Sequence, residues 1–195
     1  LDEKQCGEVA ASGGVLLGLS SSNVAAKLDA LQQRLQLSPD ELRLLVRRKP
    51  MVLAYSSERV QPQLEYLKRR MNLSEQDLRN VVVQFPAVLG YSIERNVEPK
   101  LRFLEDVALD FGYGPEEVWG RVIRNPRMLG LSLEKRYKPR VARLRKYGVD
   151  LTLSVLVSKV ALLGQEGFED FCLRAAVGSG AVRRRRRGSA ADESA

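Results

Sequence analysis

Apolar residues recur three or four positions apart through most of the chain. After Ser56 they stand at Val60, Leu64, Leu67 and Met71, a spacing that places them on one face of an α-helix. The same pattern recurs in the stretches that begin near residues 24, 97 and 137. No stretch shows the polar and apolar alternation of a half-buried strand. The pattern predicts an all-α protein built from amphipathic helices.

A second, shorter helix is predicted after each of these stretches. Ser38-Pro-Asp-Glu41 and Ser74-Glu-Gln-Asp77 place a capping residue three positions before an acid, which is typical of a helix N-terminus. Apolar residues then recur at helical spacing until a proline ends the helix. The longer helices have predicted N-caps of their own at Ser20, Ser56, Ser92 and Ser132.

A ten-residue motif that begins with proline joins the helix pairs. Its copies are Pro50-Met-Val-Leu-Ala-Tyr-Ser-Ser-Glu-Arg59, Pro86-Ala-Val-Leu-Gly-Tyr-Ser-Ile-Glu-Arg95 and Pro126-Arg-Met-Leu-Gly-Leu-Ser-Leu-Glu-Lys135, spaced by 36 and 40 residues. Copies without the proline begin at Gly14 and Val160. Each repeat therefore consists of a helix, a turn, a second helix and a short proline-led segment.

Such a repeat cannot bury its apolar faces alone, so neighbouring repeats must stack. The chain of 195 residues is long enough for one extended core of this kind. We expect an all-α helical-repeat solenoid, and the pattern leaves open whether it is right- or left-handed.

The repeat also predicts the domain boundaries. Residues 1–13 form an N-terminal flank, and the repeat domain covers residues 14–164. A capping segment at 165–180 and an Arg-rich disordered tail at 181–195 follow. Within the domain the predicted units are 14–49, 50–85, 86–125 and 126–160, with a partial unit after 160.

The recurring motif, followed by a further proline and a Leu-rich helix, resembles the mitochondrial transcription termination factor (mTERF) family. Leu129-Gly-Leu-Ser-Leu-Glu-Lys-Arg-Tyr-Lys-Pro-Arg140 is most similar to the plant and algal branch. The resemblance implies a half-ring of helix, helix and 3₁₀ units that binds nucleic acid along a basic face. It also implies a role in organellar gene expression, in the chloroplast in preference to the mitochondrion.

The net charge of the chain favours an anionic binding partner. The chain has 32 Lys and Arg against 24 Asp and Glu, a net charge of +8. The last fifteen residues hold five Arg, one Asp and one Glu, so residues 1–180 keep 27 basic and 22 acidic residues. The excess of basic residues is therefore not confined to the tail.

Several cations recur in phase with the repeat, as contacts with successive phosphates require. One position is the motif's tenth residue, and a second lies two residues before its proline. A third group is the cluster from 135 to 146, where helical spacing places Arg136, Arg140 and Arg143 on one face. The candidate nucleic-acid-binding residues are Arg48, Arg59, Arg95, Arg124, Lys135, Arg136, Lys138, Arg140 and Arg143.

Each group also has a structural explanation. A cation beside Glu58, Glu94 or Glu134 can belong to a solvated face, and a cation at a helix C-terminus can be a cap. We treat the tail residues Arg183, Arg184, Arg185, Arg186 and Arg187 as accessory because they would add only non-specific affinity.

Catalysis and cofactors have no support in the sequence. The chain has no His, which removes imidazole bases and nearly every zinc-site spacing. Cys6 and Cys172 lie far apart without a CxxC motif, so we expect reduced thiols. No apolar run approaches the length of a membrane span. The chain begins at Leu1 without a presequence, so we expect a mature or partial chain whose transit peptide lies outside it.

The leading hypothesis is a monomeric regulator of organellar transcription, including its termination, that binds double-stranded DNA. RNA binding in intron splicing or ribosome assembly is the first alternative. A helical-repeat scaffold that binds a protein partner is the second, and it predicts an exposed apolar patch where nucleic-acid binding predicts a basic stripe.

Overall fold

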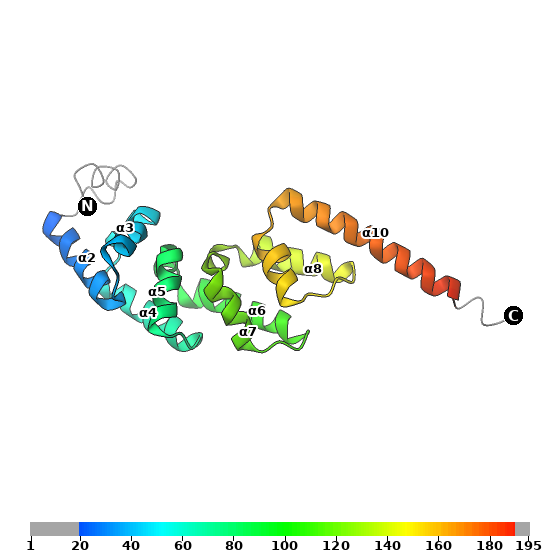
Figure 1. Cartoon of the computed structure of the whole chain (residues 1–195), viewed down its shortest axis with the longest axis horizontal. Coiled ribbons are helices and arrows are strands. Elements are labelled where there is room, and N and C mark those ends of the chain that lie inside the picture. The colour runs from blue at the N-terminus through cyan, green and yellow to red at the C-terminus, as the bar shows by residue number, and fades with distance from the viewer. Residues whose placement is uncertain (1–19, 190–195) are drawn as a thin grey trace. The chain divides into compact units, whose positions relative to one another are not determined.

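The computed structural model describes the backbone of residues 20–189 and the side chains from Ser20 to Val177, except that of Ser21. The part described is built from helices, and no strand occurs in it (Figure 1). The predicted first motif at Gly14, and Cys6, lie outside the described residues. The all-α prediction is confirmed.

The elements follow the predicted order of helix, helix and proline-led segment. The first helices of successive repeats are α2 (Ser21–Leu35), α4 (Ser57–Arg70), α6 (Glu98–Leu109) and α8 (Lys138–Lys146). The second helices are α3 (Pro39–Arg48), α5 (Glu75–Gln84), α7 (Pro115–Arg124), and α9 (Leu153–Val155) continued by the π-helix η7 (Leu156–Leu162). The proline-led segments are the 3₁₀ helices η2 (Pro50–Ala54), η3 (Pro86–Gly90) and η5 (Pro126–Gly130).

Side-chain caps fix most of the helix starts. Ser38 Oγ accepts the N–H of Glu41, and the Glu41 carboxylate accepts the N–H of Ser38, which completes a capping box. Ser20, Ser92 and Ser132 each accept the backbone N–H three residues further on. Ser56 stands at the N-cap of α4, but its side chain makes no capping hydrogen bond.

One extra residue separates the motif from the first helix in the third and fourth repeats. Val60 lies ten residues after Pro50, whereas Val97 lies eleven residues after Pro86. Two π-turns absorb the difference, η4 (Ile93–Val97) and η6 (Leu133–Tyr137). The N–H of Val97 bonds the carbonyl oxygen of Ser92, five residues back. The π-turns return the buried face of the helix to its register.

The structure divides into two compact units, Leu1–Leu101 with Val122–Gly130, and Arg102–Arg121 with Leu131–Ala195. Leu64, Leu67 and Leu78 are fully buried in the first. Tyr137 and Leu144 are fully buried in the second.

The motif segments of the first unit pack directly on one another, η2 on η3 and η3 on η5. Tyr55 lies so close to Gly90 that a Cβ there would overlap the tyrosine hydroxyl oxygen. Phe85 lies against Gly130 in the same way, because a Cβ on Gly130 would stand only 2.6 Å from the phenylalanine ring. Glycine permits this close approach because it has no side chain.

The C-terminal helix α10 spans Gln165–Ser189. It therefore contains the run from Arg183 to Arg187, which composition placed in a disordered tail. Arg and Ala are strong helix formers, and they continue the helix begun by the preceding residues. The side chains of this run and residues 190–195 lie outside the described part.

None of the helices in the described part is both long enough and apolar enough to cross a membrane.

Leu101 tests the assigned packing face because it is 0% exposed in α6. We expect Leu101→Ala to lower the free energy of unfolding by about 2–5 kcal/mol, through lost burial and the cavity left behind. Urea unfolding measures this change. The control is Leu109→Ala on the same helix, where the side chain is 68% exposed and we expect a change within about 0.5 kcal/mol. Equal effects of the two substitutions would show that the packing face is wrong.

Candidate nucleic-acid interface

One edge of the first unit contains no acidic residue. We define the motif edge as residues 44–55, 80–91 and 122–130, which hold the ends of the second helices and the proline-led segments. The acids of these helices stand in their first turns instead, as in Asp40 and Glu41 of α3, where the helix dipole favours them. Since η2, η3 and η5 pack in sequence, the three acid-free segments lie side by side.

The motif edge carries several cations, among them the predicted residues Arg48 and Arg124. Both are exposed and occupy equivalent places before the motif proline, with exposed Gln84 between them in the repeat. Arg48 also donates through Nη1 to the carbonyl oxygen of Val83, 2.6 Å away. Arg127 is exposed on the same edge. Sequence reasoning missed Arg127 because the other motifs have Met or Ala after the proline.

The motif's tenth residue is exposed in all three copies, but its contacts differ. Arg59 donates to the carbonyl oxygen of Gly90 at 2.7 Å and lies 5.5 Å from the centre of the Tyr55 ring. Arg95 and Lys135 are exposed. Arg59 and Arg95 belong to the first unit and Lys135 to the second.

The cluster from 135 to 146 differs from its predicted role. Helical spacing does place Arg136, Arg140 and Arg143 on one face, but that face packs against η7 and α10. Arg136 donates to the carbonyl oxygen of Ala161 at 2.8 Å, and Arg143 pairs with Glu169 at 2.5 Å. These two side chains are half-buried, so they link elements within the second unit.

Arg140 is the clearest departure from expectation, because it is only 4% exposed. Its guanidinium donates to the carbonyl oxygens of Val160 and Leu163, at 3.2 and 2.7 Å, and to the side chain of Gln165. It also stacks 4.4 Å from the centre of the Phe168 ring. Burial lowers the pKa of Arg140. A phosphate cannot reach it, so Arg140 does not belong to a nucleic-acid interface.

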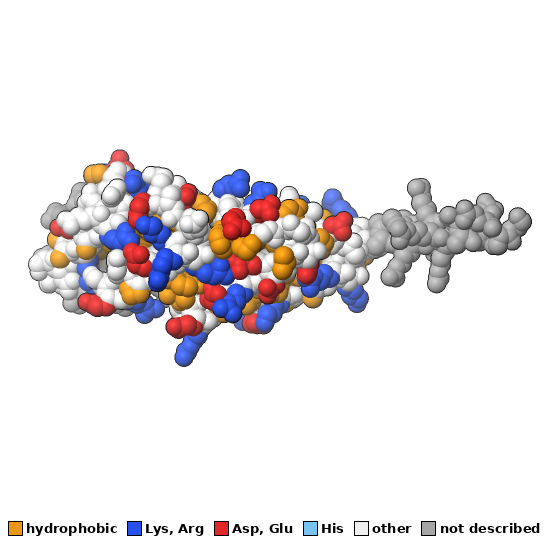
Figure 2. All heavy atoms as spheres, turned by 90° about the horizontal axis from the view of Figure 1, so that it is seen from below, with side chains coloured by type: hydrophobic (Ala, Val, Ile, Leu, Met, Phe, Trp, Pro, Cys, Tyr) orange, Lys and Arg blue, Asp and Glu red, His pale blue; other side chains and the backbone are white. Residues whose placement is uncertain are grey.

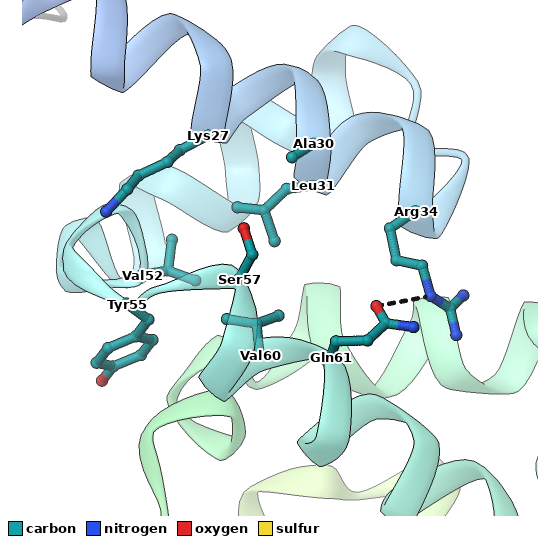
Figure 3. A pocket seen from close by; sticks show the side chains of 9 residues that line it. All are labelled: Lys27, Ala30, Leu31, Arg34, Val52, Tyr55, Ser57, Val60 and Gln61. Atoms are coloured by element: carbon teal, nitrogen blue, oxygen red, sulfur yellow. Dashed lines mark hydrogen bonds between the residues drawn. The ribbon is translucent and has the colours of Figure 1, made fainter.

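The contacts of Arg140 belong to a recurring arrangement. A polar side chain from each first helix donates to a carbonyl oxygen of the next proline-led segment or its equivalent. The four clamp residues and their acceptors are Lys27 to Leu53 (2.8 Å), Gln63 to Val88 (3.0 Å), Lys100 to Leu129 (2.6 Å) and Arg140 to Leu163 (2.7 Å). Figure 3 shows Lys27 reaching from α2 toward the turn after Val52.

The clamps give these carbonyl oxygens a side-chain donor from the preceding first helix, and the Val88 oxygen also accepts the backbone N–H of Tyr91. The spacing of apolar residues does not predict the clamps. Their sign in the sequence is a polar residue within a buried helix face, as at Gln63, Lys100 and Arg140.

Other cations of the first helices are neutralised by acids on the next first helix. Arg34 pairs with Glu65 at 2.5 Å, and Arg70 pairs with Glu98 at 2.9 Å. Lys138 pairs with Glu134 in its own repeat at 2.5 Å and is exposed. On the face shown in Figure 2, Lys and Arg side chains are interspersed with Asp and Glu. This pairing distinguishes the first helices from the motif edge, which has cations but no acids.

The described side chains include no group of three His, Cys, Asp or Glu arranged to hold a metal ion.

Lys100 makes the clamp between its repeat and the next one sensitive to pH. Its ammonium is held by the carbonyl oxygen of Leu129 and by Asn96 Oδ1, both at 2.6 Å, with the Tyr91 ring centre 5.3 Å away. Burial lowers its pKa from 10.5 to about 8. Between these values the unfolded chain binds more protons than the folded one, so the free energy of unfolding rises with pH.

We therefore expect the free energy of unfolding of the wild type to rise between about pH 7.5 and pH 9.5. It should rise by more than that of Lys100→Gln over the same range. Glutamine is the matched substitute because Gln63 makes the equivalent clamp. Urea unfolding of both proteins across this range measures the difference. Parallel pH profiles would contradict the lowered pKa.

Comparison with known proteins identifies the family. A search of curated proteins finds no match. The family model described as mTERF matches residues 1–162. The mTERF family comprises organellar, nucleic-acid-binding helical-repeat proteins that are generally not enzymes. The match covers most of the chain, and the chain belongs to the mTERF family.

Proposed function

We propose that this protein binds double-stranded DNA and regulates organellar transcription, including its termination, in the chloroplast in preference to the mitochondrion. The observation that carries the proposal is the motif edge, where exposed Arg48, Arg124 and Arg127 stand on packed segments without an acid. Duplex DNA presents regularly spaced phosphates, and a protein that neutralises them releases bound counterions. Cations that lie on packed repeats suit that regular charge.

Helix capping does not account for all of these cations. Arg48 and Arg124 end α3 and α7, where the dipole favours positive charge. Arg127 instead follows the proline that begins η5, and Arg95 lies in the π-turn before α6. Neither position is a helix C-terminus. Arg95 and Lys135 extend the proposed set within their own units. Lys138 and Arg143 contribute less because each is paired with a glutamate, and Arg136 contributes less because it is half-buried against the carbonyl oxygen of Ala161.

A gain of charge tests the proposal without removing any contact. Gln84 is exposed at the place where Arg48 and Arg124 stand in the neighbouring repeats. We expect Gln84→Arg to bind duplex DNA more tightly and to steepen the slope of log affinity against log salt by about 0.9. Fluorescence anisotropy over a range of salt concentrations measures both quantities.

The matched control is Gln76→Arg, which adds the same charge to exposed surface at the other end of α5. It should change the slope little. If both variants strengthen binding equally, the effect comes from net charge and the motif edge is not the interface.

Loss of exposed cations gives a second test. We expect the double change Arg95→Gln and Lys135→Gln to reduce the magnitude of the slope of log affinity against log salt by up to about 1.8. This is the change expected for the loss of two phosphate contacts. Thermal unfolding should change little because exposed charges contribute about 1 kcal/mol or less. The same titrations with duplex RNA and with single strands decide the nucleic acid. Tighter binding to RNA would support the RNA alternative, and no salt-dependent binding at all would favour the protein scaffold.

A further inference from the structure

A pocket opens between the first helices α2 and α4, with a volume of about 110 Å³. Its apolar floor consists of Leu31, Val52 and Val60 (Figure 3). At the end away from Tyr55, Arg34 Nε donates to Gln61 Oε1 at 3.2 Å. Ala30 lies at its rim on α2 and is exposed. An enclosed cavity of about 150 Å³ binds benzene in another protein. This pocket is smaller and opens to solvent, so a ring that enters it stays partly exposed.

The repeats show why the pocket exists. Each first helix has an equivalent of Ala30 directly before a buried leucine, at Tyr66 before Leu67, Phe103 before Leu104 and Arg143 before Leu144. Two of those large side chains approach an aromatic ring of a following element. The Phe103 ring centre lies 6.4 Å from that of Tyr137 in η6, and the Arg143 guanidinium carbon lies 6.0 Å from the centre of the Phe168 ring in α10. Ala30 has only a methyl group, so the space remains open.

The polar frame around this space is nevertheless complete. In the next repeat interface Arg70 Nε donates to Glu98 at 2.9 Å, and the Tyr66 hydroxyl donates to the same carboxylate. Arg34 and Gln61 are the residues equivalent to Arg70 and Glu98, and they form the same contact. The first interface therefore has the guanidinium and the apolar floor, and it has an amide oxygen in place of the carboxylate oxygen. It has no phenol at the place of Tyr66.

We propose that this pocket is a binding site for a tyrosine side chain of a protein partner. The ring would lie on Leu31 and Val60, and its hydroxyl would donate to Gln61 Oε1, as Tyr66 donates to Glu98. Tyr55 lines the opposite end of the pocket. Residues 1–19 and 190–195, which lie outside the described part, contain no aromatic residue. The inference does not depend on the motif edge and adds a protein contact to the proposed binding of DNA.

The first experiment uses p-cresol, the side-chain analogue of tyrosine, and follows backbone amide resonances of the whole chain. We expect saturable shifts at Ala30, Val60 and Gln61, with p-cresol binding about fivefold more tightly than toluene because of the added hydrogen bond. The absence of saturable shifts at these residues would overturn the proposal.

Variants of α2 make the test specific. Ala30→Tyr should occupy the pocket as Tyr66 does, abolish p-cresol binding and raise the melting temperature by about 2–4 °C. The control is Ala25→Tyr, an exposed site on the same helix that does not line the pocket, where p-cresol binding should persist. Loss of binding in both variants, or in neither, would contradict the assignment of the pocket.

A third experiment distinguishes a protein partner from nucleic acid. Peptides selected from a random library on the wild type, and depleted on Ala30→Tyr, should share a tyrosine and lose binding when it is replaced by alanine. Nucleosides should shift the pocket resonances only at higher concentration than p-cresol. If a nucleoside binds the pocket more tightly than p-cresol, the site is a base pocket and the proposal is wrong.

Discussion

A backbone carbonyl buried between two repeats must receive a hydrogen bond, and this requirement organises the protein. In each clamp a carbonyl oxygen of a proline-led segment, or of its equivalent, takes a side-chain donor from the preceding first helix. Lys27, Gln63, Lys100 and Arg140 are these donors. The clamp fixes the register between repeats, and it requires the first helix to present one polar residue at a set position. Where the third and fourth repeats have an extra residue, the π-turns restore that position.

The cations of the described part differ in what they contact. Lys100 and Arg140 are buried because they serve carbonyls, although their charge resembles that of a nucleic-acid contact in the sequence. Arg34 and Arg70 pair with acids on the next first helix. The exposed cations that stand on segments without acids gather on the motif edge, and net charge alone does not identify them.

The sequence predicted the fold through features that are local and repeated. The 3.6-residue periodicity, the Ser38 capping box and the recurring proline each act within a few residues, so they predicted the helices and the order of helix, helix and proline-led segment. The helix phase was also correct for Arg136, Arg140 and Arg143, which share a face. What the sequence did not show is which neighbour covers that face. That outcome depends on the packing of η7 and α10 on α8, which no short pattern records. The pocket beside Ala30 was missed for a related reason, because an alanine in a helix is ordinary until its equivalents in the other repeats are aligned with it.

We propose that the clamp residues hold the repeats together and that cations of the motif edge contact phosphate. The most direct measurement is the arginine Nε–H spectrum of the whole chain, recorded as duplex DNA is added. We expect the resonances of Arg124 and Arg127 to shift with added DNA while that of Arg140 stays in place. A shift of Arg140 without any change at Arg124 and Arg127 would contradict it.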